Sequence, residues 1–326
     1  MKINGLNVID PITQKENVTS RVYNDSTNQR LVRRLREGRS YTGCTTIDVI
    51  GCDMLCAYCY VDDSFLTGKA SDKNMLGKEL KKGTVKPYTP KELANETKLF
   101  IDENDTPKRI QITAAEPFLT PEWTIDLVKE LASFIRENKE QIWIDTNGLT
   151  IVRDPEILKK LEEYKDILRI FVSSKNSPKF YAQTTRVDPK YADTGFQCID
   201  KLWDKEYSAY LQAIAALFFP ETFEWYEKRL SKLHEAAPLL LDLDRLSYLP
   251  LPRIRSGLRS AGLWDIRQRD VKTEEAWKEH IEAHYGKSLT RLFSVDFFSQ
   301  DEALVRELIF DSNPIDKCYL FGQENK

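Results

Sequence analysis

Three cysteines stand close together in the first fifth of the sequence and have the residue type and spacing to hold a metal centre. They lie in the string Gly51-Cys52-Asp53-Met54-Leu55-Cys56-Ala57-Tyr58-Cys59-Tyr60, a CxxxCxxC spacing just after an expected strand. Three thiolates on one loop can bind a metal cluster without closing a long segment of chain. A cubane of four irons and four sulfurs normally takes four cysteines, so three leave one iron free to bind a small molecule.

A zinc site and a chance grouping of structural cysteines are the alternatives for this loop. Zinc usually takes four protein ligands, often in two paired knuckles. Here the fourth would have to come from far away, because the only histidines are His234, His280 and His284. The spacing therefore favours an iron–sulfur cluster with an open iron. The remaining cysteines are scattered and are expected to be buried structural residues: Cys44, which lies near the loop, Cys198 and Cys318.

The loop resembles the signature of the radical S-adenosylmethionine (SAM) superfamily, CxxxCxΦC, in which Φ is an aromatic residue, here Tyr58. The resemblance implies a 4Fe-4S cluster on Cys52, Cys56 and Cys59, with the amine and carboxylate of SAM on the open iron. One electron would then cleave SAM to methionine and a 5′-deoxyadenosyl radical, which abstracts hydrogen from a substrate. The resemblance places Tyr58 beside the adenine, with ordinary loop packing as the alternative.

Short apolar runs alternate with helical patterns over residues 46–245, with expected strands at 46–51, 109–113, 141–145, 167–173, 213–219 and 239–242. This order predicts an α/β fold with a parallel sheet and right-handed crossovers. Six units would make a partial (β/α)6 TIM-like barrel, short of the eight in a closed one. Residues 1–45 are expected to be an irregular lead-in with a short basic helix at 30–39. Residues 246–326 are expected to be an α-rich extension that caps the barrel or lines its substrate side.

Ligands of parallel α/β folds bind at the carboxyl ends of strands, so these ends should carry polar groups. The second expected strand ends in Ala114-Ala115-Glu116, where the superfamily has a GGEP-like motif. The resemblance implies that backbone groups and the acid there hold the methionyl ammonium of SAM. The alternative for Glu116 is an acid that stabilises a helix N-terminus.

The third expected strand ends in Asp145-Thr146-Asn147-Gly148, a string that also occurs in the pyruvate formate-lyase activating enzyme-like branch, which this chain resembles. The resemblance implies that these residues form a cation and SAM-carboxylate environment; an Asn-Gly turn is the alternative. The fourth ends in Ser173-Ser174-Lys175, where that branch often has Asp-x-Lys. Lys175 could pair with a carboxylate of SAM or substrate, with a solvated lysine as the alternative. Ser173 departs from the acidic position and argues against an activase-type cation site.

A group of arginines follows the sixth expected strand and includes Arg253, Arg255 and Arg259. These side chains could contact a phosphate or an acidic substrate, with a solvated basic surface as the alternative. The whole chain of 326 residues has 48 Lys and Arg against 51 Asp and Glu, a net charge of −3. Bulk charge therefore does not indicate a nucleic-acid or membrane partner.

The predicted function is a radical SAM enzyme acting on a protein or peptide, including glycyl-radical activation. An external one-electron donor resembling flavodoxin or ferredoxin would supply the electron. RNA or small-molecule modification is the alternative within the enzyme class, and a non-catalytic iron–sulfur or zinc module for electron transfer or partner binding is the alternative outside it. The absence of a signal peptide and of an apolar run of about 18 residues leads us to expect a cytoplasmic protein.

Overall fold

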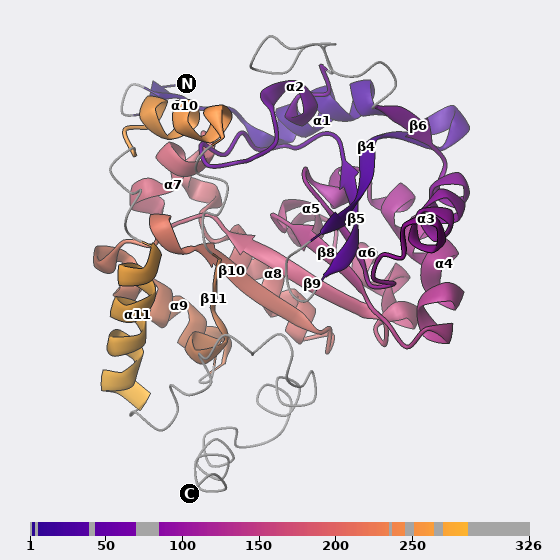
Figure 1. Ribbon diagram of the computed structural model, residues 1–326. Helices are drawn as coiled ribbons and strands as arrows, with labels where there is room; N and C mark the ends of the chain where they lie inside the picture. The colour runs from indigo at the N-terminus through magenta and orange to yellow at the C-terminus, as the bar shows by residue number, and fades with distance from the viewer. Residues whose placement is uncertain are drawn as a thin grey trace, which may run out of the picture.

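The computed structural model of the protein describes residues 2–3, 6–38, 43–69, 85–234, 237–244, 251–263 and 270–285. Within these residues a nine-stranded sheet forms the centre, and helices lie around it (Figure 1). The strand order is β11-β10-β9-β8-β7-β5-β4-β3, with β6 paired to β4. A separate two-stranded sheet is formed by β1 (Lys2–Ile3) and β2 (Leu6–Asn7).

Six neighbouring strands of the sheet run parallel, as the β-then-α order predicts. They are β5 (Cys44–Val49), β7 (Ile110–Thr113), β8 (Ile142–Thr146), β9 (Leu168–Ser174), β10 (Ala209–Ile214) and β11 (Asp242–Asp244). Antiparallel strands follow beyond β5: β4 (Gln29–Gly38), β3 (Tyr23–Asn24) and β6 (Lys86–Tyr88). In the described chain the sheet stays open, since its order begins at β11 and ends at β3. The predicted partial barrel is confirmed.

Helices connect the parallel strands. They are α3 (Pro90–Asn104), α4 (Pro121–Glu137), α5 (Leu149–Arg153), α6 (Glu156–Lys160), α7 (Pro178–Thr185), α8 (Thr194–Trp203) and α9 (Phe223–Leu233). Helix α3 shows why its boundary is readable in sequence: Thr89 N donates to Glu92 Oε2 (2.8 Å), and Glu92 N donates to Thr89 Oγ1 (3.3 Å). This capping box and Pro90 in the first turn fix its start.

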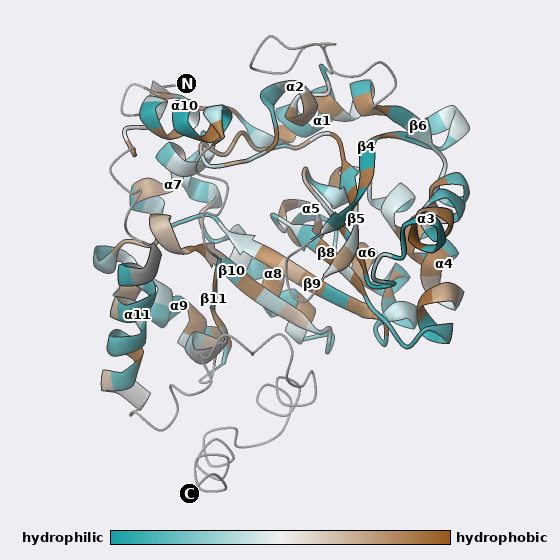
Figure 2. Ribbon diagram, viewed as in Figure 1, coloured by the Kyte–Doolittle hydropathy of each residue, from teal (hydrophilic) through white to brown (hydrophobic). Residues whose placement is uncertain are grey.

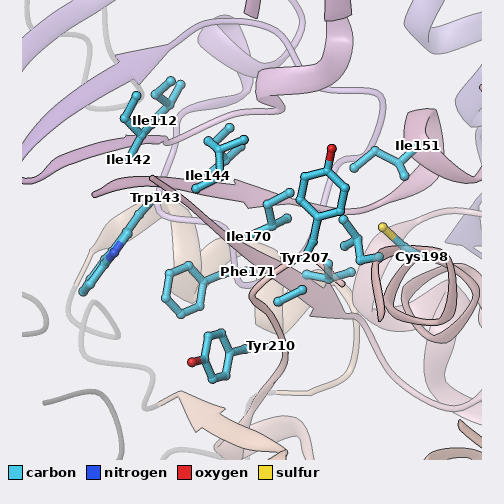
Figure 3. Packing of buried hydrophobic residues seen from close by; sticks show 14 of the residues in the cluster. Ile112, Ile142, Trp143, Ile144, Ile151, Ile170, Phe171, Cys198, Tyr207 and Tyr210 are labelled. Carbon is cyan, nitrogen blue, oxygen red and sulfur yellow. The ribbon is translucent and has the colours of Figure 1, made fainter. Parts of the chain in front are cut away.

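The main hydrophobic core lies where the parallel strands meet the helices. Ile112, Ile144 and Ile170 occupy neighbouring register positions on β7, β8 and β9, and all are fully buried. Alternate residues point to the opposite face, where the Phe171 ring lies 5.3 Å from Trp143 and 5.5 Å from Tyr210. Figure 3 shows the two sets on opposite sides of the strands. Both faces of these strands are therefore packed, as parallel sheets require.

The basic helix predicted at residues 30–39 is wrong, because residues Gln29–Gly38 form strand β4, antiparallel to β5 and β6. Leucines and arginines at helical spacing suggested an amphipathic helix, but strand pairing overrides that local pattern. The N-terminal residues are also more regular than expected, since α1 (Pro11–Val22) begins at an Asp10 cap.

Two other strand predictions need correction. The strand expected at 213–219 is β10 at Ala209–Ile214, followed by a 3-10 turn at Ala215–Leu217. The apolar run continues past the strand because Phe218 packs against Phe223 (4.9 Å) and Trp277 (5.0 Å). The strand expected at 239–242 begins at Asp242 and is β11.

The described part of the C-terminal extension contains two helices, α10 (Pro252–Ser260) and α11 (Asp270–Tyr285). Figure 2 shows both hydrophilic and hydrophobic residues on α10, and its buried residues are Arg253, Ile254, Gly257 and Leu258. In Figure 1, α10 lies on the same side of the molecule as α7, α1 and α2. No helix in the described ranges is both long and apolar enough to span a membrane.

Candidate functional site

The cysteine loop runs from the carboxyl end of β5 to the short helix α2 (Asp63–Leu66). Its backbone is held near its start and in its middle: Cys52 N donates to Leu66 O (2.9 Å), and Ala57 N donates to Thr184 O (2.8 Å) at the end of α7. The loop starts at Gly51, whose φ of +94° favours glycine and whose added Cβ would lie 2.6 Å from Leu119 Cδ2. The loop conformation is thus fixed by neighbours on three elements.

The three thiols of the loop are free of disulfides, with Cys56 buried and Cys52 and Cys59 half-buried. Met54 N donates to Cys52 Sγ (3.4 Å), a contact of the kind that stabilises thiolate ligands. Burial raises the pKa of the Cys59 thiol to about 11, and the charge of Arg253 acts in the opposite direction. Iron binding would displace these protons, because a bound thiol is deprotonated.

Glu116 lies at the end of β7 and points into the same region. It is 2% exposed, and its carboxylate accepts hydrogen bonds from Thr146 Oγ1 (2.7 Å), Asn147 N (2.8 Å) and Phe118 N (3.0 Å). Burial raises the pKa of Glu116, whereas the hydrogen bonds from Asn147 and Thr146 oppose that shift. Three donors leave room for one more on a carboxylate, which has about four acceptor positions.

Asn147 joins this acid to the cysteine loop. Its Nδ2 donates to Asp53 Oδ1 (2.5 Å), while its backbone N–H binds Glu116. Asp53 is fully buried, and its second oxygen, Oδ2, has no hydrogen-bond partner within the described chain. Burial and the nearby Glu116 charge raise the pKa of Asp53 to about 7. The sequence analysis did not select Asp53, although it stands next to Cys52.

The other predicted strand-end residues lie around the same pair of carboxylates. Asp145 Oδ2 accepts from Gln111 Nε2 (2.8 Å), and burial raises the pKa of Asp145 to about 6. The Lys175 ammonium lies 5.9 Å from the centre of the Tyr58 ring, and its charge acts on both Glu116 and Asp145.

Ser173 is half-buried one position before the end of β9. The Asn-Gly turn is present as well: Gly148 has a φ of +79° and caps α5. The polar pattern of Asp145–Gly148 thus forms both a turn and part of the site.

Arg30 is a site residue that the sequence analysis placed on the wrong kind of element. It is fully buried on β4 and donates to the backbone oxygens of Ile50 (3.1 Å) and Glu116 (2.7 Å). It thereby ties the residue before the cysteine loop to the acidic motif. Within that motif Ala114 has a φ of +80°, in the left-handed region that favours glycine. Ala115 does not have a positive φ.

Arg253, predicted as a substrate or phosphate contact, binds the protein's own cysteine loop. It is 5% exposed and donates to Cys56 O (2.8 Å), Ala57 O (3.1 Å) and Asp63 Oδ1 (2.8 Å). Such a guanidinium is not open to a phosphate. Arg255 and Arg259 are exposed on the same helix, and their substrate role stays a prediction.

Two of the three cysteines outside the loop are in the described part of the structure. Cys44 and Cys198 are fully buried, as expected of structural residues, and Cys318 lies outside the described residues. Cys44 Sγ contacts Gln111 Oε1 (3.3 Å) on the neighbouring strand. Cys198 packs against Gly148, where an added Cβ would lie 2.7 Å from its own Cβ. Both residues therefore have packing roles.

Comparison with known families decides the class of this site. The model of the radical SAM superfamily matches residues 46–209, half of the chain, from within β5 to the first residue of β10. The chain belongs to the radical SAM superfamily. Members of this superfamily use a 4Fe-4S cluster and SAM.

Solved structures with similarity to this chain include two forms of the protein anSMEcpe. The histidine-tagged form with bound AdoMet is 12% identical, with a TM-score of 0.44, over 81% of this chain and 64% of that chain. The native form with bound AdoMet and Cp18Cys peptide is 13% identical, with a TM-score of 0.45, over the same shares. This chain therefore spans less than two thirds of their length. No curated protein shows significant sequence similarity to it.

The residues present fit the cofactors of the superfamily. Among the described residues, no three side chains of His, Cys, Asp and Glu converge on a point where one metal ion could bind. A cubane carries each of three cysteines on a different iron, which the three thiols of one loop can supply. Asp53 Oδ2, beside Glu116, has no hydrogen-bond partner among the described residues, which fits a cationic donor such as the methionyl ammonium of SAM.

Proposed function

We propose that this chain is a radical SAM enzyme that holds its 4Fe-4S cluster on Cys52, Cys56 and Cys59 and binds SAM against Glu116 and Asp53. The observation that carries the proposal is the pair of buried carboxylates joined by Asn147 beside the cysteine loop. When bound, a cluster with one open iron would pass one electron from the external donor to SAM, whose C–S bond would then break to give methionine and a 5′-deoxyadenosyl radical.

The protein groups have separable roles in binding SAM. Asp53 Oδ2 and the remaining acceptor position of Glu116 would receive the ammonium, since a buried unpaired acceptor favours a charged donor. Lys175 would pair with the methionyl carboxylate, and Tyr58 beside it would pack against the adenine. Thr146 and Asn147 hold the two carboxylates through the hydrogen bonds already described. Asp145, bound to Gln111, would contribute charge near the methionyl part of SAM.

The substrate is proposed to be a protein or peptide, as in the pyruvate formate-lyase activating enzyme-like branch. The open sheet supports this, because a barrel of six units leaves its inner face reachable from the side for an extended chain. A small external protein of the flavodoxin or ferredoxin type is the proposed one-electron donor.

The test is reconstitution of the full chain with iron and sulfide under anaerobic conditions. The protein should bind about four irons and, with dithionite and SAM, release 5′-deoxyadenosine. Cys56→Ala should abolish release, whereas Cys198→Ala, a buried cysteine away from the loop, should retain it. Iron binding without any 5′-deoxyadenosine would favour a non-catalytic iron–sulfur module. Transfer of deuterium from a labelled candidate peptide into 5′-deoxyadenosine would then test the substrate class.

A further inference from the structure

Helix α10 lies outside the residues matched by the superfamily model, yet it lies directly on the cysteine loop. Arg253 reaches from its first turn to Cys56 O (2.8 Å) and Ala57 O (3.1 Å). Its other terminal nitrogen binds Asp63 Oδ1 (2.8 Å), just past the loop. One guanidinium therefore joins the middle of the loop to the helix that follows it.

The approach of α10 to the loop is unusually close. An added Cβ at Gly257 would lie 2.1 Å from Ala57 O, so no side chain fits between the helix and the loop. Ile254 and Leu258, on the same face of α10, are fully buried in one cluster with Met54, Cys56, Ala57 and Tyr58. Helix α10 therefore packs directly on the cysteine loop, through its backbone, its apolar side chains and a buried guanidinium.

The position of Arg253 also has an electrostatic consequence. Its charge is 5% exposed and acts on Cys59, whereas its partner Asp63 is half-exposed and screened by water. Reduction adds one negative charge to a cluster, and a buried cation close by stabilises that charge. Net charge and hydrogen bonding around the cysteines are the main protein influences on iron–sulfur reduction potentials.

We propose that Arg253 is a positioning residue for the cluster: it fixes the Cys56–Cys59 part of the loop and raises the reduction potential of the cluster. The inference rests on the proposed placement of the cluster on the three cysteines. It assigns to the C-terminal extension a part in electron entry, in addition to capping the barrel or lining its substrate side.

The test compares Arg253→Gln, Arg253→Lys and Arg255→Gln in the reconstituted full chain. Arg255→Gln is the matched control, because it removes the same charge from an exposed position on the same helix. At a fixed applied potential, Arg253→Gln should lower the ratio of reduced to oxidised cluster about tenfold. This corresponds to a midpoint potential about 59 mV lower in a redox titration followed by EPR. Arg253→Lys should keep most of the potential but lose the contact in which one nitrogen binds the two carbonyls and the other binds Asp63. Arg255→Gln should match the unsubstituted protein.

Amide exchange of residues 52–63 in the chain without iron provides a second readout that does not need a cluster. Exchange should be faster in both Arg253 variants and unchanged in Arg255→Gln. Equal potentials and equal exchange in Arg253→Gln and Arg255→Gln would overturn the inference. If the unsubstituted chain binds no cluster, the proposed function fails, while the exchange data still decide whether Arg253 holds the loop.

Discussion

Asn147 Nδ2 lies 2.5 Å from Asp53 Oδ1, and this contact links the end of β8 to the residue that follows the first cysteine of the loop. Asn147 also binds Glu116 through its backbone N–H (2.8 Å). One residue thus holds two buried carboxylates side by side. Their desolvation and mutual repulsion cost free energy, which a cationic ligand would offset. The SAM site that we propose is built on this arrangement.

Asp53→Asn should weaken binding of SAM to the cluster-loaded protein by about tenfold or more, because it removes a charge-assisted acceptor for the ammonium. Equilibrium dialysis with labelled SAM would measure this change. Glu122→Gln, on the exposed surface of α4, is the control and should leave the affinity unchanged. Identical dissociation constants for Asp53→Asn and the control would exclude Asp53 from the SAM site.

Ala114→Gly should stabilise the protein by about 1 kcal/mol, since a φ of +80° is strained for alanine and free for glycine. Ala115→Gly is the matched control at the next position, where φ is not positive, and should destabilise by about 0.5–1 kcal/mol. Urea unfolding of the two variants gives both values. Destabilisation by Ala114→Gly equal to that of Ala115→Gly would show that position 114 carries no strain.

Asp145 should make the protein less stable as the pH rises toward neutrality. Its folded-state pKa of about 6 lies above its ordinary value of 3.8, so the folded protein binds more protons than the unfolded chain between these values. The contribution of Asp145 to the free energy of unfolding is therefore fully present below about pH 4 and is lost as the pH rises through about 6. Melting temperatures from pH 4 to 8 should fall less steeply in Asp145→Asn. Parallel curves for the two proteins would contradict the raised pKa.

Arg30→Met should destabilise the protein by about 3 kcal/mol, because it removes a buried hydrogen-bond network that joins Ile50, Glu116 and Pro117. Arg255→Gln, at an exposed position, should cost less than about 0.5 kcal/mol. Urea unfolding measures both. A loss below about 1 kcal/mol in Arg30→Met would mean that the acidic motif holds its position without this arginine.

The parts of this protein that sequence predicts well are those set by local pattern. The CxxxCxxC spacing, the Asn-Gly turn after β8 and the cap at Thr89 all depend on neighbours within a few residues. The parallel strands follow from apolar runs between helices. The order of the parallel strands could therefore be derived in advance, although the bounds of two of them were displaced.

The contacts that complete the site join segments that are far apart in the sequence. A local sequence pattern cannot predict such contacts. Arg253 is 197 positions from Cys56, and Arg30 is 86 positions from Glu116. Arg30 even carries a misleading signal, because leucines and arginines near it are spaced as on a helix. Its strand is fixed by pairing with β5 and β6, which only the folded sheet shows.

The proposed site requires SAM to bind directly to an iron that the protein leaves open. The most direct measurement is the EPR spectrum of the anaerobically reduced 4Fe-4S cluster before and after addition of SAM. SAM should change the signal in the unsubstituted protein and in Cys198→Ala. A cluster signal that is indifferent to SAM would contradict it.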